Sequence, residues 1–245
     1  MDKSDFKKVE SGRLAPRAYA VPHTKKKDAL KADYKTERYN SDIVRILSGE
    51  WEFKYYKKKS KLPATIDTSK IKFDKVNVPS TWQRTGYEIP EYINTPYGFD
   101  NRKFGGEWGK GVRPPELPED FSCGIYRKFI NIEDKTKNYV LTFLGITPCV
   151  DLYINGVFVG FGEGAHNSYE FDVTEYLKEG ENEILAVVFK WSIGSYLEAQ
   201  DMFRENGIFR DVLLYTYEKS YINDFQAIAE KKGKKYNLNI KAEIK

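Results

Sequence analysis

The stretch VDLYINGVFVGF, residues 150–161, decides the fold of this chain. Two runs of alternating apolar residues flank Asn155-Gly156. An Asn-Gly link between two such runs is the strongest short signal for a β-hairpin, because both positions accept a positive φ. We therefore predict a tight hairpin here, with antiparallel β-structure around it.

The segments on either side extend the same pattern. GEWEFKYY (49–56) alternates, with Trp51, Phe53 and Tyr55 on one side. We find no segment with a sustained 3.6-residue apolar period, so we predict an all-β fold, a jelly-roll β-sandwich with long loops at one end. Further strands are expected in KFDKVNVPSTW (72–82), GIYRKFINI (124–132), NYVLTFLGI (138–146) and, around a short turn, EFDVTEYLKEGENEILAVVFKW (170–191).

Changes in charge and in the alternation of apolar residues divide the chain into three parts. Residues 1–48 are charged and irregular, so we expect an extended N-terminal segment, followed by the sandwich over residues 49–216. From residue 217 two alternating runs flank KKGKK (231–235), which predicts a second hairpin. Because a lone hairpin is marginal in water, we expect residues 217–245 to begin a second, truncated β domain and the chain to be a fragment.

Composition narrows the classes of function. The 245 residues carry 40 basic and 36 acidic side chains, a net charge of +4, and this balance gives no reason to expect nucleic-acid binding. The first 20 residues lack the apolar core of a signal peptide, and no apolar run is long enough to span a membrane. With only Cys123 and Cys149, we expect a reduced, cytoplasmic protein; a disulfide between them stays open as an alternative.

Candidate chemistry gathers in GSYLEAQDMFRENGIFRDVLLY, residues 194–215. Two His and two Cys, far apart, give no zinc-type spacing, so we expect no metal site of that kind. Glu198, Asp201 and Glu205 could supply the carboxylate pair of a glycosidase. The alternative is that they form ion pairs with the nearby arginines and only stabilise the loop. Carboxylates and amides held among aromatics also suit sugar hydroxyls, which both donate and accept hydrogen bonds.

The same stretch resembles the signature of glycoside hydrolase family 2 as it occurs in large bacterial β-galactosidases, at the end of their N-terminal sugar-binding region. The resemblance implies a galactose-binding-like jelly roll followed by an immunoglobulin-like β-sandwich, of which residues 217–245 would be the first strands. It covers nearly the whole chain, through motifs in the same order: SGEWEF (48–53), VPSTWQRTGYEIPEYINTPY (78–97), LYINGVFVGFGEG (152–164), EFDVTEYLKEGEN (170–182) and KWSIGSYLE (190–198).

The resemblance also implies two sugar-binding residues. Asp201, in the QDMFR motif, is expected to reach the galactose subsite and to help hold a monovalent cation, usually Na⁺. Asn94, in the Y-x-N stretch Tyr92-Ile93-Asn94, is expected to line the same site. From the residues alone, Asn94 would be read as a turn residue before Thr95-Pro96.

Residues around Asp201 are expected to support it. Arg204, Glu205 and Arg210 are predicted to form ion pairs, and Phe203, with Met202, a packed anchor. Where Phe203 stands, the related enzymes often carry Trp.

The resemblance places the catalytic groups outside this chain. In such enzymes two catalytic glutamates and a Mg²⁺ site lie on a (β/α)₈ barrel, so we expect no catalytic residue and no cofactor here, with Mg²⁺ and Na⁺ implied for the complete enzyme. The complete enzyme would hydrolyse terminal β-D-galactosides with retention, and these 245 residues alone would be inactive. Expected partners are a β-galactoside, the remaining domains of the polypeptide and further copies in a homo-oligomer. The alternatives are a free-standing carbohydrate-binding module and a family 2 enzyme of β-glucuronidase or β-mannosidase specificity.

Overall fold

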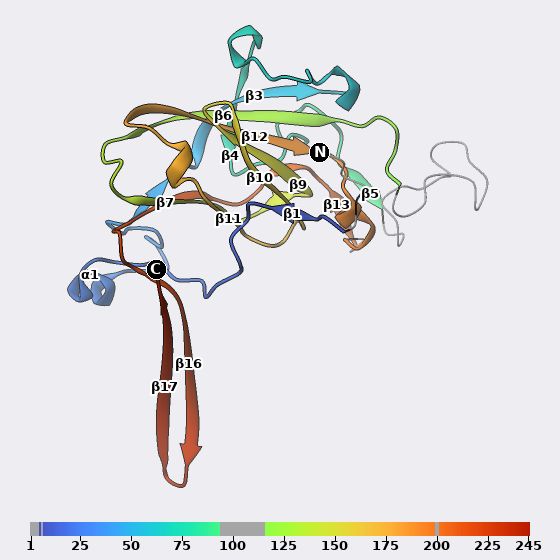
Figure 1. Cartoon of the computed structure of the whole chain (residues 1–245). Coiled ribbons are helices and arrows are strands. Elements are labelled where there is room, and N and C mark those ends of the chain that lie inside the picture. Colours follow the sequence, from blue (N-terminus) through green and yellow to red (C-terminus); the bar gives the residue numbers. More distant parts are fainter. Residues whose placement is uncertain (1–4, 6, 94–115, 199–200) are drawn as a thin grey trace.

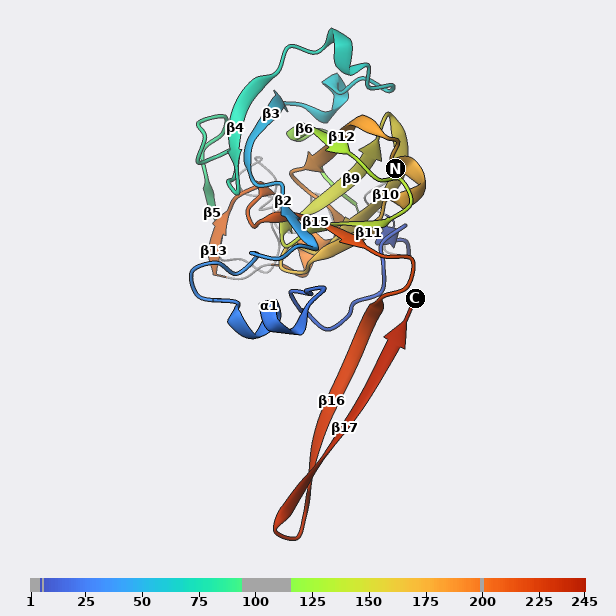
Figure 2. The same ribbon diagram turned by 90° about the vertical axis from the view of Figure 1, so that its left-hand side faces the viewer.

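The protein is a β-sandwich from which one long hairpin extends (Figures 1 and 2). The computed structural model describes residue 5 and residues 7–93, 116–198 and 201–245. The larger sheet has seven strands, in the spatial order β1 (Glu10–Ser11), β10 (Val157–Glu163), β9 (Cys149–Ile154), β12 (Gly180–Phe189), β6 (Cys123–Ile132), β3 (Gly49–Tyr56) and β4 (Asp74–Val78). The facing sheet has four, in the order β11 (Tyr169–Asp172), β7 (Asn138–Phe143), β15 (Val212–Tyr217) and β2 (Val44–Ile46).

Small elements complete the fold. Three two-stranded pairs are β5 (Glu91–Ile93) with β13 (Met202–Arg204), β8 (Ile146–Thr147) with β14 (Gly207–Ile208), and β16 (Ile222–Lys232) with β17 (Lys235–Ile244). The helical pieces are α1 (Lys26–Lys31) and the 3₁₀ turns η1 (Lys59–Lys61), η2 (Thr68–Lys70), η3 (Thr174–Tyr176) and η4 (Ile193–Tyr196). The all-β prediction is therefore confirmed.

The hairpin predicted at Asn155-Gly156 joins β9 to β10. Asn155 has φ 51° and Gly156 has φ 79°, and the flanking Ile154 and Val157 face each other across the strands. Further along β10, an ideal Cβ on Gly162 would lie 2.4 Å from the ring of Tyr169. A close approach of the two strands therefore explains this glycine.

The core lies between the two sheets. Trp51 and Phe53 from β3 are buried and share one cluster with Leu141 and Phe143 from β7 and Val150 from β9. This burial fixes the register of each strand, because a one-residue slip would turn every apolar side chain to the opposite face. The sandwich is thus a rigid platform for the loops at its ends.

The N-terminal segment is less irregular than its sequence suggested. It contains α1 and supplies an edge strand to each sheet, since β1 pairs with β10 and β2 pairs with β15. Arg17 donates to both carboxylate oxygens of Glu170, at 2.6 and 2.9 Å, and to the hydroxyl of Tyr217. Short-range patterns did not predict these strands because their partners lie far away in the chain.

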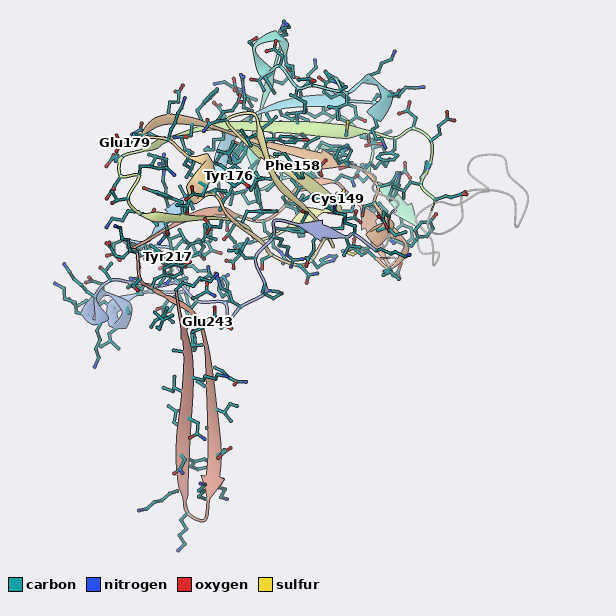
Figure 3. The ribbon with its side chains drawn as sticks, in the orientation of Figure 1. Cys149, Phe158, Tyr176, Glu179, Tyr217 and Glu243 are labelled. Atoms are coloured by element: carbon teal, nitrogen blue, oxygen red, sulfur yellow. The ribbon has the colours of Figure 1, made fainter. Side chains whose placement is uncertain are left out.

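The second predicted hairpin is confirmed as β16–β17. It leaves the sandwich just after Tyr217, whose side chain Figure 3 labels at the end of β15. Both strands carry exposed apolar side chains, among them Phe225, Ile228, Leu238 and Ile240. An exposed ribbon of this length buries little of its own surface, so its stability must be low compared with that of the sandwich.

Cys123 and Cys149 are both buried, and neither forms a disulfide. They flank the same residue, since Phe189 of β12 pairs with Cys123 on one side and Cys149 on the other. Burial raises the pKa of the Cys123 thiol to about 12, so it behaves as a small apolar side chain. Among the helices in the described part of the chain, none is long and apolar enough to cross a membrane.

Replacing a single core valine tests the sandwich. Val150 is fully buried, whereas Val157 on the same hairpin is 54% exposed. We expect Val150→Ala to lower the free energy of unfolding by about 2 kcal/mol, through lost burial and the cavity left behind. Val157→Ala should change it by under about 0.5 kcal/mol. Urea unfolding measures both, and equal losses would contradict this assignment of the core.

Candidate functional site

A buried lysine lies at the end of β12, where the predicted site begins. The side chain of Lys190 is 8% exposed. Its Nζ contacts Glu88 Oε1 at 2.5 Å and Glu91 Oε1 at 3.1 Å. An unpaired buried ammonium is strongly unfavourable, so the two carboxylates neutralise it and tie the segment before β5 to the end of β12.

The second carboxylate oxygen of Glu88 also accepts hydrogen bonds. Glu88 Oε2 accepts from Trp82 Nε1 at 2.9 Å and from Ser122 Oγ at 3.0 Å. Burial lowers the pKa of Lys190, but its hydrogen bonds and charge interactions with Glu88 and Glu91 outweigh burial and raise the pKa above its ordinary 10.5. The Lys190 ammonium therefore stays protonated throughout the neutral range.

A buried amide pair fixes the chain after β13. Asn206 donates from its backbone N–H to Gln83 Oε1 at 2.8 Å and accepts from Gln83 Nε2 at 2.9 Å. Its side chain also donates to the carbonyl of Lys190 at 3.0 Å. Gly207 follows with φ 132°, and a Cβ there would lie 2.5 Å from the hydroxyl of Tyr126. Only glycine fits where the backbone passes this hydroxyl so closely. The amide contacts hold the segments around residues 83 and 206 together.

Asp201 lies at the start of the β5–β13 ribbon. In the ribbon, Tyr92 pairs with Phe203 and Glu91 pairs with Arg204. The hydroxyl of Tyr92 donates to Asp201 Oδ1. Asp201 is exposed, so the fold presents a carboxylate at the surface. Figures 1 and 2 show β5 and β13 side by side, well away from the β16–β17 hairpin.

The predicted aromatic anchor is not packed in the described structure. Phe203 is 58% exposed and Met202 is 42% exposed. The ring of Phe203 meets Tyr92 edge-on, at 5.6 Å between centroids and 61° between planes. In the described structure β13 belongs to a two-stranded ribbon and no further layer covers these side chains, so their role as an anchor stays a prediction.

Glu198 contacts Arg204 of the ribbon, and both side chains are partly buried. Glu198 Oε1 accepts from the backbone N–H of Ala165 at 2.5 Å, and Arg204 donates to the carbonyl of Glu198. Burial raises the pKa of Glu198, although the Ala165 bond and the charge of Arg204 oppose this. Burial likewise lowers the pKa of Arg204, against the charge of Glu198.

Glu205 and Arg210, predicted to form supporting ion pairs, contact segments far away in the chain. Glu205 pairs with Arg84 at 3.1 Å and accepts from the Thr81 hydroxyl at 3.2 Å. Arg210 donates to the carbonyls of Leu144 and His166, both at 3.4 Å. The sequence offered neighbouring opposite charges, but the backbone directs these side chains to other loops.

A pocket of about 140 Å³ lies behind the ribbon. Its wall includes Lys190, Glu198, Phe203, Arg204 and Asn206, so the end of β12, β13 and the segment after β13 all reach it. The predicted sugar-binding residue Asn94 is outside the described residues. Within the described ranges no group of three or more His, Cys, Asp or Glu side chains could hold a metal ion; Asp201 supplies a single carboxylate, which alone does not complete a cation site.

Sequence reasoning missed Lys190, Glu88 and Tyr92. The one available signal was a lysine directly after the apolar run EILAVVF, where a buried strand ends. Its partners precede it by 102 and 99 positions, so no local spacing could identify them.

Comparisons with known proteins agree with this architecture. Residues 44–218 match the family described as "Glycosyl hydrolases family 2, sugar binding domain". The chain is 37% identical over 227 residues to a β-galactosidase of Actinobacillus pleuropneumoniae, covering 92% of this chain and 21% of that protein. It is 37% identical over 223 residues to a β-galactosidase of Staphylococcus xylosus, covering 89% and 21%. The chain thus spans about a fifth of the length of these relatives.

Solved structures share the fold. A β-glucuronidase of Ruminococcus gnavus superimposes with a TM-score of 0.59 at 14% identity, over 84% of this chain and 35% of that chain. A β-D-mannosidase of Dictyoglomus thermophilum gives 0.53 at 22% identity, over 82% and 26%. At these identities the likeness concerns the sandwich alone.

Removing the buried cation tests the lysine cluster. We expect Lys190→Met to lower the free energy of unfolding by about 2–3 kcal/mol, because two carboxylates lose their counter-ion, with partial exposure of Glu91 moderating the loss. The control is Lys75→Met, since Lys75 and Glu50 form a pair with side chains 69% and 61% exposed. That change should cost far less, because an exposed ion pair contributes little to stability. Thermal and urea unfolding would show the difference, and equal effects would contradict the role of Lys190.

The raised pKa of Glu198 predicts a pH effect. A carboxyl whose pKa is higher in the folded state stabilises the fold at low pH, and this contribution disappears as pH rises through the folded pKa. Glu198→Gln removes the titration and keeps an acceptor for Ala165. We expect the stability of this variant relative to the wild type to be greater at pH 7 than at pH 4, measured by urea unfolding. Glu230→Gln on the exposed hairpin controls for the loss of charge, and a difference independent of pH would contradict the prediction.

Proposed function

Because the chain belongs to the sugar-binding domain family of glycoside hydrolase family 2, we propose that it forms one wall of the active site of a β-galactosidase. In this proposal Asp201 and Asn94 bind the galactosyl unit. The observation that carries it is the exposed carboxylate of Asp201, held at the end of the β5–β13 ribbon by Tyr92. The 37% identity to β-galactosidases over most of the chain supports the choice of sugar.

The chemistry of Asp201 suits this role. An ionised carboxylate has about four lone-pair sites on two oxygens, so the bond from Tyr92 to Oδ1 leaves capacity for a sugar hydroxyl or a Na⁺ ion. Na⁺, when bound, would supply a fixed positive charge for sugar oxygens. Asp201 would contribute one ligand to it, and Arg204, Glu205, Arg210 and Phe203 would support the segment that carries Asp201.

The reaction itself would use groups that this chain does not provide. In the proposal the complete protein hydrolyses terminal β-D-galactosides with retention, using two carboxylates and Mg²⁺ from its other domains, while residues 1–245 alone are inactive. Retaining hydrolysis needs two carboxyl groups about 5 Å apart across the glycosidic bond. The carboxylates near the ribbon are engaged instead in structural contacts, as Glu198 is with Ala165 and Glu205 with Arg84.

The same proposal covers the organisation of the longer protein. Residues 1–48 form an N-terminal segment, residues 49–216 the sugar-binding domain, and residues 217–245 the start of an immunoglobulin-like domain. The exposed apolar side chains of β16 and β17 support this division, because further strands of such a domain would cover them. Cytoplasmic location and homo-oligomer formation belong to the proposal as well, and the absence of a disulfide between the two buried thiols fits a reducing compartment.

Substitution of Asp201 in the longer protein tests the proposal. We expect Asp201→Asn to lower kcat/KM for a chromogenic β-galactoside by about 100-fold, because a charged hydrogen-bond acceptor for sugar and cation is lost. The matched control is Asp74→Asn, since Asp74 also accepts from a tyrosine hydroxyl, that of Tyr87, at 3.1 Å. The control should keep kcat/KM within about twofold.

Two results would overturn the proposal. One is an Asp201→Asn enzyme with unchanged kcat/KM. The other is clear turnover of the β-galactoside by residues 1–245 alone, because the carboxylates of this chain would then perform the chemistry themselves.

A further inference from the structure

The proposed function assigns a role to Asp201 but none to Tyr92, the residue whose hydroxyl contacts it. We propose that Tyr92 is a positioning residue, which fixes the orientation of the Asp201 carboxylate through its hydroxyl while Phe203 fixes the ring of Tyr92. This inference rests on the proposed function of Asp201 and adds a residue to the machinery of the site.

The register of the ribbon brings the three side chains to one face. Phe203 lies directly opposite Tyr92. Asp201 is two residues before Phe203, and residues i and i+2 of an extended chain point to the same side. Diagonal neighbours across an antiparallel pair are within reach of a long aromatic side chain. The Tyr92 hydroxyl therefore meets Asp201 Oδ1 as a consequence of strand pairing.

Contact between the rings determines where the hydroxyl lies. Tyr92 is 51% exposed and Phe203 is 58% exposed, so burial in the core does not hold either ring. They meet edge-on at 5.6 Å, a preferred arrangement for aromatic pairs. With its ring held at the edge, Tyr92 directs its hydroxyl to Asp201.

The carboxylate needs such a partner because it is exposed. An aspartate at the surface samples several rotamers, whereas binding requires one orientation, and an immobilised group loses less entropy when the ligand arrives. A hydroxyl that donates to an ionised oxygen makes one of the stronger hydrogen bonds in proteins. The bond to Asp201 is also the largest cause of the raised pKa of Tyr92, so the hydroxyl remains a donor at every pH at which the enzyme would work.

Charges at the other end of the ribbon anchor it to the sandwich. Glu91 contacts Lys190 at 3.1 Å, and Arg204, opposite Glu91, donates to the carbonyl of Glu198. Two short strands alone would be marginal. With this anchor the ribbon becomes a stable support for the pair formed by Tyr92 and Asp201.

Tyr92→Phe is the direct test, because it removes the hydroxyl and keeps the ring that contacts Phe203. The matched control is Tyr87→Phe, since Tyr87 also donates to an aspartate, Asp74, and also meets a phenylalanine edge-on, at 5.0 Å from Phe53. In the longer enzyme we expect Tyr92→Phe to lower kcat/KM for a β-galactoside about tenfold. Tyr87→Phe should leave it within about twofold.

A double variant distinguishes positioning from general support of the fold. If Tyr92 acts only through Asp201, the variant Tyr92→Phe/Asp201→Asn should match Asp201→Asn alone in kcat/KM. A merely structural role would make the two losses multiply. Multiplying losses, or wild-type kcat/KM in Tyr92→Phe, would overturn the inference.

A titration of the 245-residue chain separates this inference from the proposed function. The pKa of Tyr92, followed by NMR of labelled tyrosine, should fall towards its ordinary value of 10.0 in Asp201→Asn, because the charged acceptor is lost. An unchanged Tyr92 pKa would overturn the contact itself. If the pKa falls as expected but Asp201→Asn leaves activity unchanged in the longer enzyme, the proposed function fails while the contact stands.

Discussion

The need to neutralise Lys190 determines where the loops of this sandwich can lie. Lys190 directly follows the apolar strand β12, so its ammonium group is buried, and an unpaired cation there would be very unfavourable. Glu88 and Glu91 approach to 2.5 and 3.1 Å, and so the segment that leads into β5 is held against the end of β12. Most of the geometry of the candidate site follows from this pairing.

Two further constraints act on the same place. The amide pair of Gln83 and Asn206 holds the segment after β13, and Gly207 allows the backbone to pass the hydroxyl of Tyr126. Charge, amide pairing and close backbone approach together set the position of a ribbon that is too short to be stable alone. The sandwich supplies rigidity, and the polar contacts at its end determine which side chains reach the surface, Asp201 among them.

Local patterns in the sequence predicted those parts of the fold whose causes are local. Alternation and the Asn155-Gly156 link predicted the central hairpin, because strand period and turn conformation depend on neighbouring residues. The partners of Lys190 and Glu205 were not predicted, since they lie about a hundred positions away and only the completed fold brings them close. The 58% exposure of Phe203 could not be predicted either, because a local motif does not show how many layers cover its strand.

Amide hydrogen exchange provides the most direct test of the claim that Lys190 holds the ribbon in place. Exchange would be compared between the wild-type chain and Lys190→Met, with attention to residues 91–93 and 202–206. The account predicts faster exchange in both segments of the variant, whereas β6 and β9 keep their protection, because only the end of the sandwich loses its anchor. Unchanged exchange in the two segments would contradict the central role of this lysine.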